Sequence, residues 1–180
     1  MERTVRVKVE PLSEEAFRPF GEVLGPRARP ADYQGVNSVG WKAGFESSGA
    51  PVVMLLSSRY AGLRFSRLER HLNVTQTFIP LGRVPAIVAV AAPTAEDPGA
   101  IPAPEDVRAF LLDGTAGYAL KRGAWHSLDR YPLHPPSAEI VIITSRDTQE
   151  ELETVEREHR RLTQEVDYAA RFGVTFELQL

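Results

Sequence analysis

The sequence predicts a mainly β domain, built as a sandwich or a barrel, that ends in one helix and one further strand. Several short segments alternate apolar and polar residues, which is the period of a strand with one buried face. Turn residues separate these segments about every 8–12 residues, a spacing typical of all-β sandwiches and barrels. The chain has 180 residues, which suits one domain that can bury a sizeable core.

The first elements are a strand, a helical turn and a long loop. Residues 5–9 alternate valine with charged residues and predict a half-buried strand. Ser13 is a suitable N-cap for a short helical turn over residues 14–17. Residues 25–49 are rich in Pro, Gly, Ser and Asn, which predicts a loop with short extended pieces. A loop of this length in a compact domain is usually functional or mobile.

The middle of the chain predicts the body of the barrel. Its segments are apolar runs or alternate in character, and turns rich in Pro, Gly or Asp separate them. We expect strands over residues 52–56, 62–71, 75–80, 86–92, 107–112, 118–120 and 139–144.

The C-terminal part changes to a helical pattern. Its less polar residues follow one another at alternating steps of three and four, which predicts an amphipathic α-helix over residues 148–172. Ser145 or Asp147 suits the N-cap of this helix, and Gly173 suits its C-terminal end. Residues 174–180 then alternate like a strand. The residues of the predicted apolar helix face are Leu152, Val155, His159, Leu162, Val166 and Ala169.

The composition excludes several classes of protein and site. The 21 basic and 24 acidic side chains give a net charge of −3, whereas a nucleic-acid-binding domain would carry a basic excess. The chain has no cysteine, which excludes disulfides, thiolate metal ligands and a cysteine nucleophile. Neither a signal peptide nor an apolar run of membrane-spanning length is visible. We therefore expect a soluble cytoplasmic protein that binds neither nucleic acid nor membrane.

Two short segments carry the side chains best suited to chemistry. Glu69 and His71 are two residues apart in an expected strand, so their side chains share one face. A short turn after His71 brings Gln76 back beside them. In the second segment, Gly123 permits a tight turn that can direct His126 into the barrel. These side chains are the candidate site.

Both segments resemble the ureidoglycolate lyase family of cupin-like enzymes. The first matches the family pattern of leucine-glutamate-arginine-histidine, a following glutamine, and phenylalanine-isoleucine-proline-leucine. Against the first cupin motif, Glu69 and His71 match a histidine pair and Gln76 matches a glutamate. His126 matches the histidine of the second cupin motif. The resemblance covers about residues 8–145, and its matched stretches are residues 11–21, 68–71, 75–76, 78–81, 107–110 and 122–126.

The resemblance implies a cupin-like double-stranded β-helix, a jelly-roll barrel, over residues 1–145. The predicted helix and strand of residues 146–180 would form an extension that packs on the barrel or on a dimer partner. The resemblance also implies a homodimer, for which this C-terminal arm is a candidate swapping element.

The implied activity is that of a lyase acting on ureidoglycolate, a small hemiaminal hydroxy-acid, in purine or allantoin degradation. Release of urea and glyoxylate needs a base for the hydroxyl proton and an acid for the leaving nitrogen. His71 or His126 is the candidate base. Glu69 is the candidate acid, or the group that orients an imidazole, and Gln76 completes the candidate catalytic set.

The carboxylate of such a substrate needs a cation, and a guanidinium can hold it at two points. Arg70, Lys121 and Arg122 are the candidates for holding it. Asn37 and Trp125 are further candidate substrate contacts. The chain departs from the family pattern at Lys121, where a histidine is common, and around Asn37, where the usual arginine pair and histidine are missing.

The resemblance leaves metal dependence open. His71, His126, Glu69 and Gln76 would form the ligand set, and their donor atoms suit nickel, manganese or zinc. One alternative function is a related cupin enzyme, metal-dependent or not, that acts on another small hydroxy- or keto-acid. Another is a non-catalytic dimeric cupin that binds a small ligand. The departures at Lys121 and around Asn37 favour the first alternative.

Overall fold

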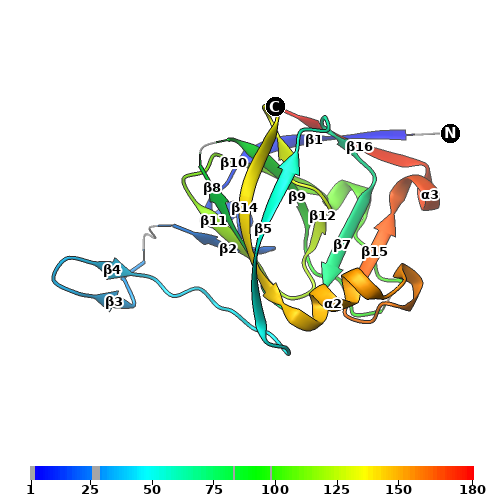
Figure 1. The fold of residues 1–180 in the computed structure, drawn as a ribbon. Coiled ribbons are helices and arrows are strands. Elements are labelled where there is room, and N and C mark those ends of the chain that lie inside the picture. Colours follow the sequence, from blue (N-terminus) through cyan, green and yellow to red (C-terminus); the bar gives the residue numbers. More distant parts are fainter. Residues whose placement is uncertain (1–2, 26–28, 83, 98) are drawn as a thin grey trace.

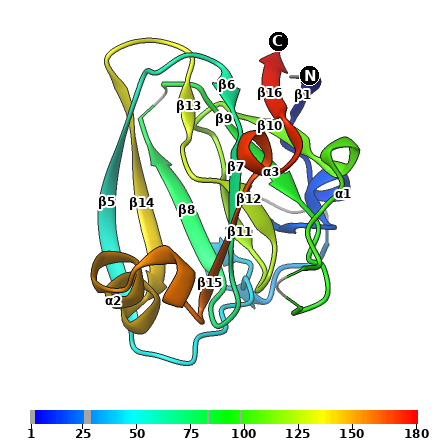
Figure 2. The same cartoon turned by 90° about the vertical axis from the view of Figure 1, so that its right-hand side faces the viewer.

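The computed structural model shows two curled β-sheets that face each other, as seen in Figure 1 and, after a quarter turn, in Figure 2. This architecture confirms the predicted mainly β, jelly-roll type of barrel. The structure describes residues 3–25, 29–82, 84–97 and 99–180. Within these ranges, every helix is too short or too polar to cross a membrane.

A nine-stranded sheet forms one wall of the barrel. β1 lies between β10 and β16 and pairs in parallel with both. The remaining strand pairs of this sheet are antiparallel. Its strands are β1 (Arg3–Pro11), β6 (Arg64–Phe65), β7 (Arg67–His71), β9 (Ala86–Ala91), β10 (Arg108–Leu112), β12 (Trp125–Ser127), β13 (Tyr131–Pro132), β15 (Thr163–Asp167) and β16 (Val174–Gln179).

A five-stranded sheet, in the order β2-β11-β8-β14-β5, forms the facing wall. β14 alternates between half-buried and buried residues, the pattern of a strand with one face on the core. It pairs antiparallel with both β5 and β8. The strands of this sheet are β2 (Gly21–Leu24), β5 (Pro51–Arg59), β8 (Gln76–Leu81), β11 (Gly117–Leu120) and β14 (Ser137–Ser145).

Two hydrophobic clusters stabilise the sheets. One contains residues of both sheets, such as Phe78 and Val88, and therefore lies between them. The other includes Leu68 and Phe176 and lies on the opposite face of the nine-stranded sheet. β9 is buried along its whole length, and its residues alternate between the two clusters. A side chain's position along its strand therefore decides whether it faces the barrel interior.

Two short helical elements, α1 and η1, lie between strands in the part of the chain that precedes β10. α1 (Glu14–Phe17) begins at Ser13, whose side chain accepts a hydrogen bond from the Ala16 N–H, as the sequence predicted. Phe17 at its end is fully buried in the cluster between the sheets. η1 (Pro104–Asp106) precedes β10. α1 therefore contributes an aromatic side chain to the core between the two sheets.

The prediction of one continuous helix over residues 148–172 is wrong. α2 (Arg146–Thr154) begins where predicted, and the Ser145 side chain caps it. The chain then forms η2 (Arg157–His159), strand β15, and the short helix α3 (Tyr168–Phe172). Gly173 ends α3 in the left-handed conformation at φ 64°, as predicted, and the predicted final strand is β16.

The residues predicted to form one apolar helix face lie in different environments in the structure, so they do not form one helix. β15 pairs antiparallel with β7, which places Thr163 beside His71 and Val166 beside Leu68. Val166 packs in a hydrophobic cluster, whereas His159, predicted on the same helix face, is exposed. The Glu151 carboxylate accepts three backbone N–H groups just before this strand. β15 and β16 both pair with strands of their own chain.

The long loop contains a hairpin that projects from the barrel (Figure 1). Its strands are β3 (Tyr33–Gln34) and β4 (Val39–Gly40), the short extended pieces that the sequence predicted. The bidentate pairing of Arg29 with Asp32 and a hydrogen bond from the Trp41 indole stabilise its base. Residues 26–28 of the predicted loop lie outside the described residues.

Candidate active site

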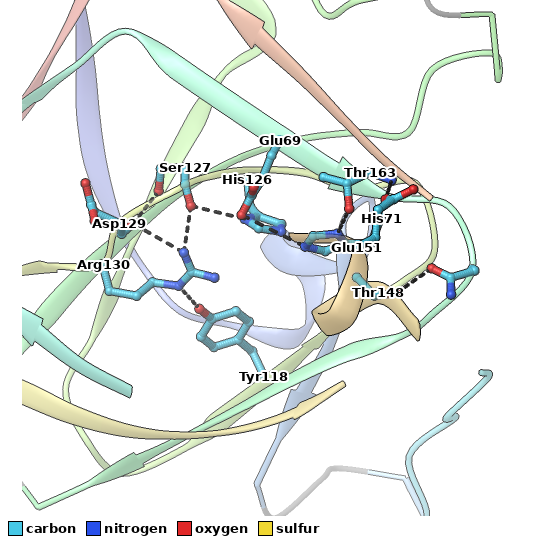
Figure 3. A network of polar contacts seen from close by, with 11 residues as sticks. Glu69, His71, Tyr118, His126, Ser127, Asp129, Arg130, Thr148, Glu151 and Thr163 are labelled. Atoms are coloured by element: carbon cyan, nitrogen blue, oxygen red, sulfur yellow. Dashed lines mark hydrogen bonds and ion pairs between the residues drawn. The ribbon is translucent and has the colours of Figure 1, made fainter. Parts of the chain in front are cut away.

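Two neighbouring strands, β7 and β12, bring the matched motifs together. They pair antiparallel, and His126 lies directly opposite Glu69. Paired residues share a face of the sheet, and His71 shares it because it follows Glu69 by two residues. The His71 and His126 rings lie 5.2 Å apart between their centroids. Figure 3 shows the three side chains gathered on this face.

The turn before β12 is the one that the sequence predicted. Gly123 adopts φ 75°, a conformation that side chains other than glycine rarely take. Its N–H donates to the His71 carbonyl at 2.8 Å, which joins the end of β7 to the start of β12. The turn therefore directs His126 to the face that carries His71.

Each histidine has one ring nitrogen held and one without a partner. Nδ1 of His71 lies 3.0 Å from the Thr163 hydroxyl, and Nδ1 of His126 donates to the Ser127 carbonyl at 3.1 Å. Because a carbonyl can only accept, Nε2 of neutral His126 carries a lone pair. Both Nε2 atoms are buried and have no hydrogen-bond partner among the described residues. Such orphan nitrogens suit a ligand, a metal or a proton transfer.

Glu69 lies between the two imidazoles. Its Oε1 is 3.9 Å from Nε2 of His71 and 3.9 Å from Nδ1 of His126. Its side chain keeps 14% of its surface exposed, so the cluster is not sealed from solvent. Burial raises the pKa of Glu69 to about 7, although the charge of Arg130 opposes this shift. The carboxyl group can therefore hold or release a proton near neutral pH.

Burial has the opposite effect on the imidazoles, since it disfavours their charged form. It lowers the pKa of His71 to about 4, with the Arg130 charge adding to the effect. It also lowers the pKa of His126 well below its usual value, again with Arg130 contributing. Both rings are therefore neutral at pH 7 and can act as bases or as metal ligands.

The facing wall contributes Gln76 at the start of β8. Its Oε1 is buried and has no partner among the described residues, as is true of the Thr144 hydroxyl. The β14–β8 register pairs Ile143 with Thr77, so its continuation places Thr144 beside Gln76. Orphan polar atoms thus occur on both walls of the barrel interior.

Arg130 also reaches this interior, and the sequence interpretation did not include it. It follows β12, is 2% exposed, and its Nε donates to the Tyr118 hydroxyl at 2.5 Å (Figure 3). Its guanidinium carbon lies 4.1 Å from the centre of the Phe78 ring. No local pattern around Asp129-Arg130-Tyr131 distinguishes this arginine from a surface residue, and only the register of β12 and β13 reveals its burial.

Two predicted substrate contacts lie on the opposite face of the nine-stranded sheet. Arg70 alternates with Glu69 and His71 along β7, and Trp125 precedes His126 in β12. The Arg70 guanidinium lies 4.7 Å from the centre of the Trp125 ring and hydrogen-bonds the Gln164 side chain and the Thr94 carbonyl. The structure therefore does not bring this pair to the imidazoles.

The other predicted contacts lie at the surface. Nζ of Lys121 is 3.5 Å from the Arg18 carbonyl, and Nε of Arg122 donates to the Leu72 carbonyl at 2.9 Å. Asn37 is exposed at the turn of the projecting hairpin. Of the predicted residues, the structure therefore brings together the two histidines and Glu69, with Gln76 on the facing wall.

The cluster also fits a divalent metal ion. Glu69, His71 and His126 each offer one ligand atom, and these three atoms lie within 4.8 Å of one another. The orphaned Oε1 of Gln76, on the facing wall, is a further candidate acceptor. His126 donates its other ring nitrogen to a carbonyl, as metal-binding imidazoles commonly do. Two imidazoles with a carboxylate and an amide oxygen suit nickel, manganese or zinc.

Comparison with known proteins gives the same family for a family model and for individual relatives. The family model described as ureidoglycolate lyase matches residues 4–164, which is longer than the stretch of resemblance seen in the sequence. The ureidoglycolate lyase of Azotobacter vinelandii is 35% identical over 131 residues, covering 67% of this chain and 74% of the relative. The ureidoglycolate lyase of Brucella abortus is 36% identical over 126 residues, covering 66% of this chain and 71% of the relative.

Proposed function

Because the chain belongs to the ureidoglycolate lyase family, and so to a family of lyases, we propose that it cleaves ureidoglycolate into glyoxylate and urea. One observation carries the proposal: two buried, neutral imidazoles with unpartnered Nε2 atoms adjoin a carboxyl group inside the barrel. The substrate carbon bears a hydroxyl group, a carboxylate and a urea nitrogen. Its cleavage requires one proton to leave the hydroxyl and one to reach the nitrogen.

His126 is the proposed base. Its Nδ1 donates to the Ser127 carbonyl, which leaves the Nε2 lone pair to accept the hydroxyl proton of the substrate. The electrons of the O–H bond then form the aldehyde carbonyl of glyoxylate as the C–N bond breaks. The C–N electrons remain on the urea nitrogen, which needs a proton.

Glu69 is the proposed acid. Its carboxyl oxygen lies 3.9 Å from a nitrogen of each imidazole, so it can protonate the leaving nitrogen and then recover a proton from His126. His71 orients the carboxyl group, and Thr163 orients His71 in turn. The cycle consumes no net proton, which agrees with the balance of the proposed reaction.

The direct test is to incubate the protein with racemic ureidoglycolate and follow glyoxylate. We expect release well above the spontaneous rate, with consumption of one enantiomer ahead of the other because a folded site is chiral. A rate equal to spontaneous decay would sink the proposal. Activity on a different small hydroxy- or keto-acid would then support the alternative enzyme of the same fold.

A metal-dependent form of the reaction is the second candidate, because three buried acceptor atoms lack partners. His71, His126, Glu69 and Gln76 would hold the ion. A bound divalent ion would polarise the substrate hydroxyl and lower its pKa. A lone pair that binds an ion is not free to accept a proton, so His126 performs one of these roles and not both.

Metal analysis decides between the two forms. In the metal-dependent form, purified protein should carry about one nickel, manganese or zinc ion per chain, removable by a chelator, with activity lost and regained accordingly. His71→Ala and His126→Ala should each lower the bound metal to background. His134→Ala, a change at an exposed histidine, is the control. Unchanged metal content in both site variants would refute metal binding by these histidines.

A homodimer is the second part of the proposal, and an apolar surface supports it. The outer face of the five-stranded sheet exposes 63% of Leu55 and 39% of Ile79. Strand register places both in one row with Val141 between them. Exposed apolar patches that span several strands commonly mark protein interfaces. A second copy of this chain is the proposed occupant.

We expect Leu55→Glu to convert the dimer into a monomer, because it places a charge in the centre of the apolar face. Light scattering coupled to size-exclusion chromatography gives the mass directly. Val36→Glu on the projecting hairpin, where the side chain is fully exposed, is the matched control. A monomeric mass for the unchanged protein, or a dimeric mass for Leu55→Glu, would contradict this interface.

A further inference from the structure

Arg130 is a buried cation without an acidic partner. Among the described residues no carboxylate lies within 4.0 Å of its guanidinium nitrogens, although the same criterion pairs the more exposed Arg67 and Arg108 with Glu165 and Glu10. It is 2% exposed. Burying an unpaired charge costs several kcal/mol, so a protein that retains one needs a compensating interaction.

Neutral groups supply part of that compensation. Nη1 donates to the carbonyls of Ser127 and Asp129 at 2.7 and 3.2 Å, and Nε donates to the Tyr118 hydroxyl. The guanidinium also covers the face of the Phe78 ring. These contacts fix the plane of the guanidinium and reach both sheets. None of them carries a negative charge.

The remaining nitrogen, Nη2, has no hydrogen-bond partner among the described residues. Figure 3 shows it on the side of the guanidinium away from Ser127 and without a dashed line. The interior therefore offers a fixed cation with an unused donor to any ligand that enters it.

We propose that Arg130 binds the carboxylate of the substrate, and that it makes the site specific for small 2-hydroxy- or 2-oxo-carboxylates over their uncharged analogues. A carboxylate supplies the missing negative charge and accepts from Nη2. This assignment rests on the proposed lyase function and names the group that recognises its substrate. It also orients the substrate hydroxyl toward the imidazoles on β7 and β12.

The arginines within the matched motifs, Arg70 and Arg122, are less suited to this role. Arg70 has its donors occupied by Gln164, Thr94 and backbone carbonyls on the far side of the sheet. Arg122 is exposed and donates to a backbone carbonyl. Arg130 contacts the Tyr118 and Phe78 side chains of the barrel interior and has a nitrogen to spare.

Calorimetric binding of glycolate and of glycolamide, its uncharged amide, tests the assignment. The unchanged protein should bind glycolate about 10- to 100-fold more tightly than glycolamide, the range of a charge-assisted hydrogen bond in a buried site. Arg130→Gln should abolish that preference by weakening glycolate alone. Arg130→Lys should retain part of it, and Arg161→Gln, at an exposed arginine, should retain all of it.

The outcomes separate this inference from the lyase function. Failure to cleave ureidoglycolate, with glycolate binding that still depends on Arg130, would refute the function and keep the carboxylate site. Cleavage of ureidoglycolate with an unchanged KM in a folded Arg130→Gln protein would support the lyase function and refute the role of Arg130. If Arg130→Gln does not fold, equal affinity of the unchanged protein for glycolate and glycolamide, or binding of neither, overturns the inference.

Discussion

Replacing His126 with alanine is expected to lower kcat/KM for ureidoglycolate by about 10²–10⁴-fold, the contribution typical of a positioned general base. The variant removes the unpartnered Nε2 of His126, and the His71 ring, whose centroid lies 5.2 Å away, occupies a different position. Steady-state kinetics with continuous detection of glyoxylate measure the effect. The loss should appear mainly in kcat, because the proton transfer belongs to the transition state.

The controls for this prediction test whether the His126 variant folds and whether His126 acts as a base. His126 is buried, so thermal unfolding and circular dichroism must show that the variant still folds. His126→Gln fills more of the space and serves as a second variant. Added imidazole should restore part of the activity if His126 acts as a base. Full activity in a folded His126→Ala protein would exclude His126 from the reaction.

Replacing Glu69 with glutamine should lower kcat by about 10²-fold or more, since the amide cannot donate a carboxyl proton to the leaving nitrogen. The change is nearly isosteric, and it leaves both Nδ1 contacts of the imidazoles in place. KM should change little if Arg130 holds the substrate. Glu69→Gln therefore separates chemistry from binding in a way that Arg130→Gln does not.

Glu165→Gln is the matched comparison for this change. Glu165 lies opposite Glu69 in the β15–β7 register and pairs with Arg67 and Arg157. Its replacement should lower stability through lost ion pairs and leave kcat within a few-fold of the unchanged protein. A similar kcat loss in both variants would indicate that Glu69 acts through the structure of the sheet.

Local patterns predicted most of the strands and failed where tertiary pairing decided. β14 and β16 alternate clearly, and Ser13 and Ser145 cap helices as their positions indicated. Residues 155–169 have helical spacing, yet β15 forms because β7 offers it a strand edge to pair with, and because Thr163 and Val166 are buried there. The spacing of apolar residues at steps of three and four cannot reveal a partner strand such as β7.

The residues of the candidate site also divide into those that local sequence patterns predicted and one that they did not. Glu69, His71 and His126 could be predicted because each sits in a motif whose spacing fixes its face. The position of Arg130 could not be predicted, because its burial depends on the path of the chain after β12. Lys121 and Arg122 adjoin the motif in sequence but lie at the surface. Proximity along the chain thus predicted the clustered histidines and did not predict the buried Arg130.

The position of β1 has a consequence for how the protein is made. β1 is synthesised well before both of its partners, β10 and β16, which lie far along the chain. Thr163, which holds His71, also comes late in synthesis. Parallel pairing over such long sequence separations is slow to form. The part of β1 that pairs with β16 therefore stays without its partner strand until β16 has been synthesised, well after β10.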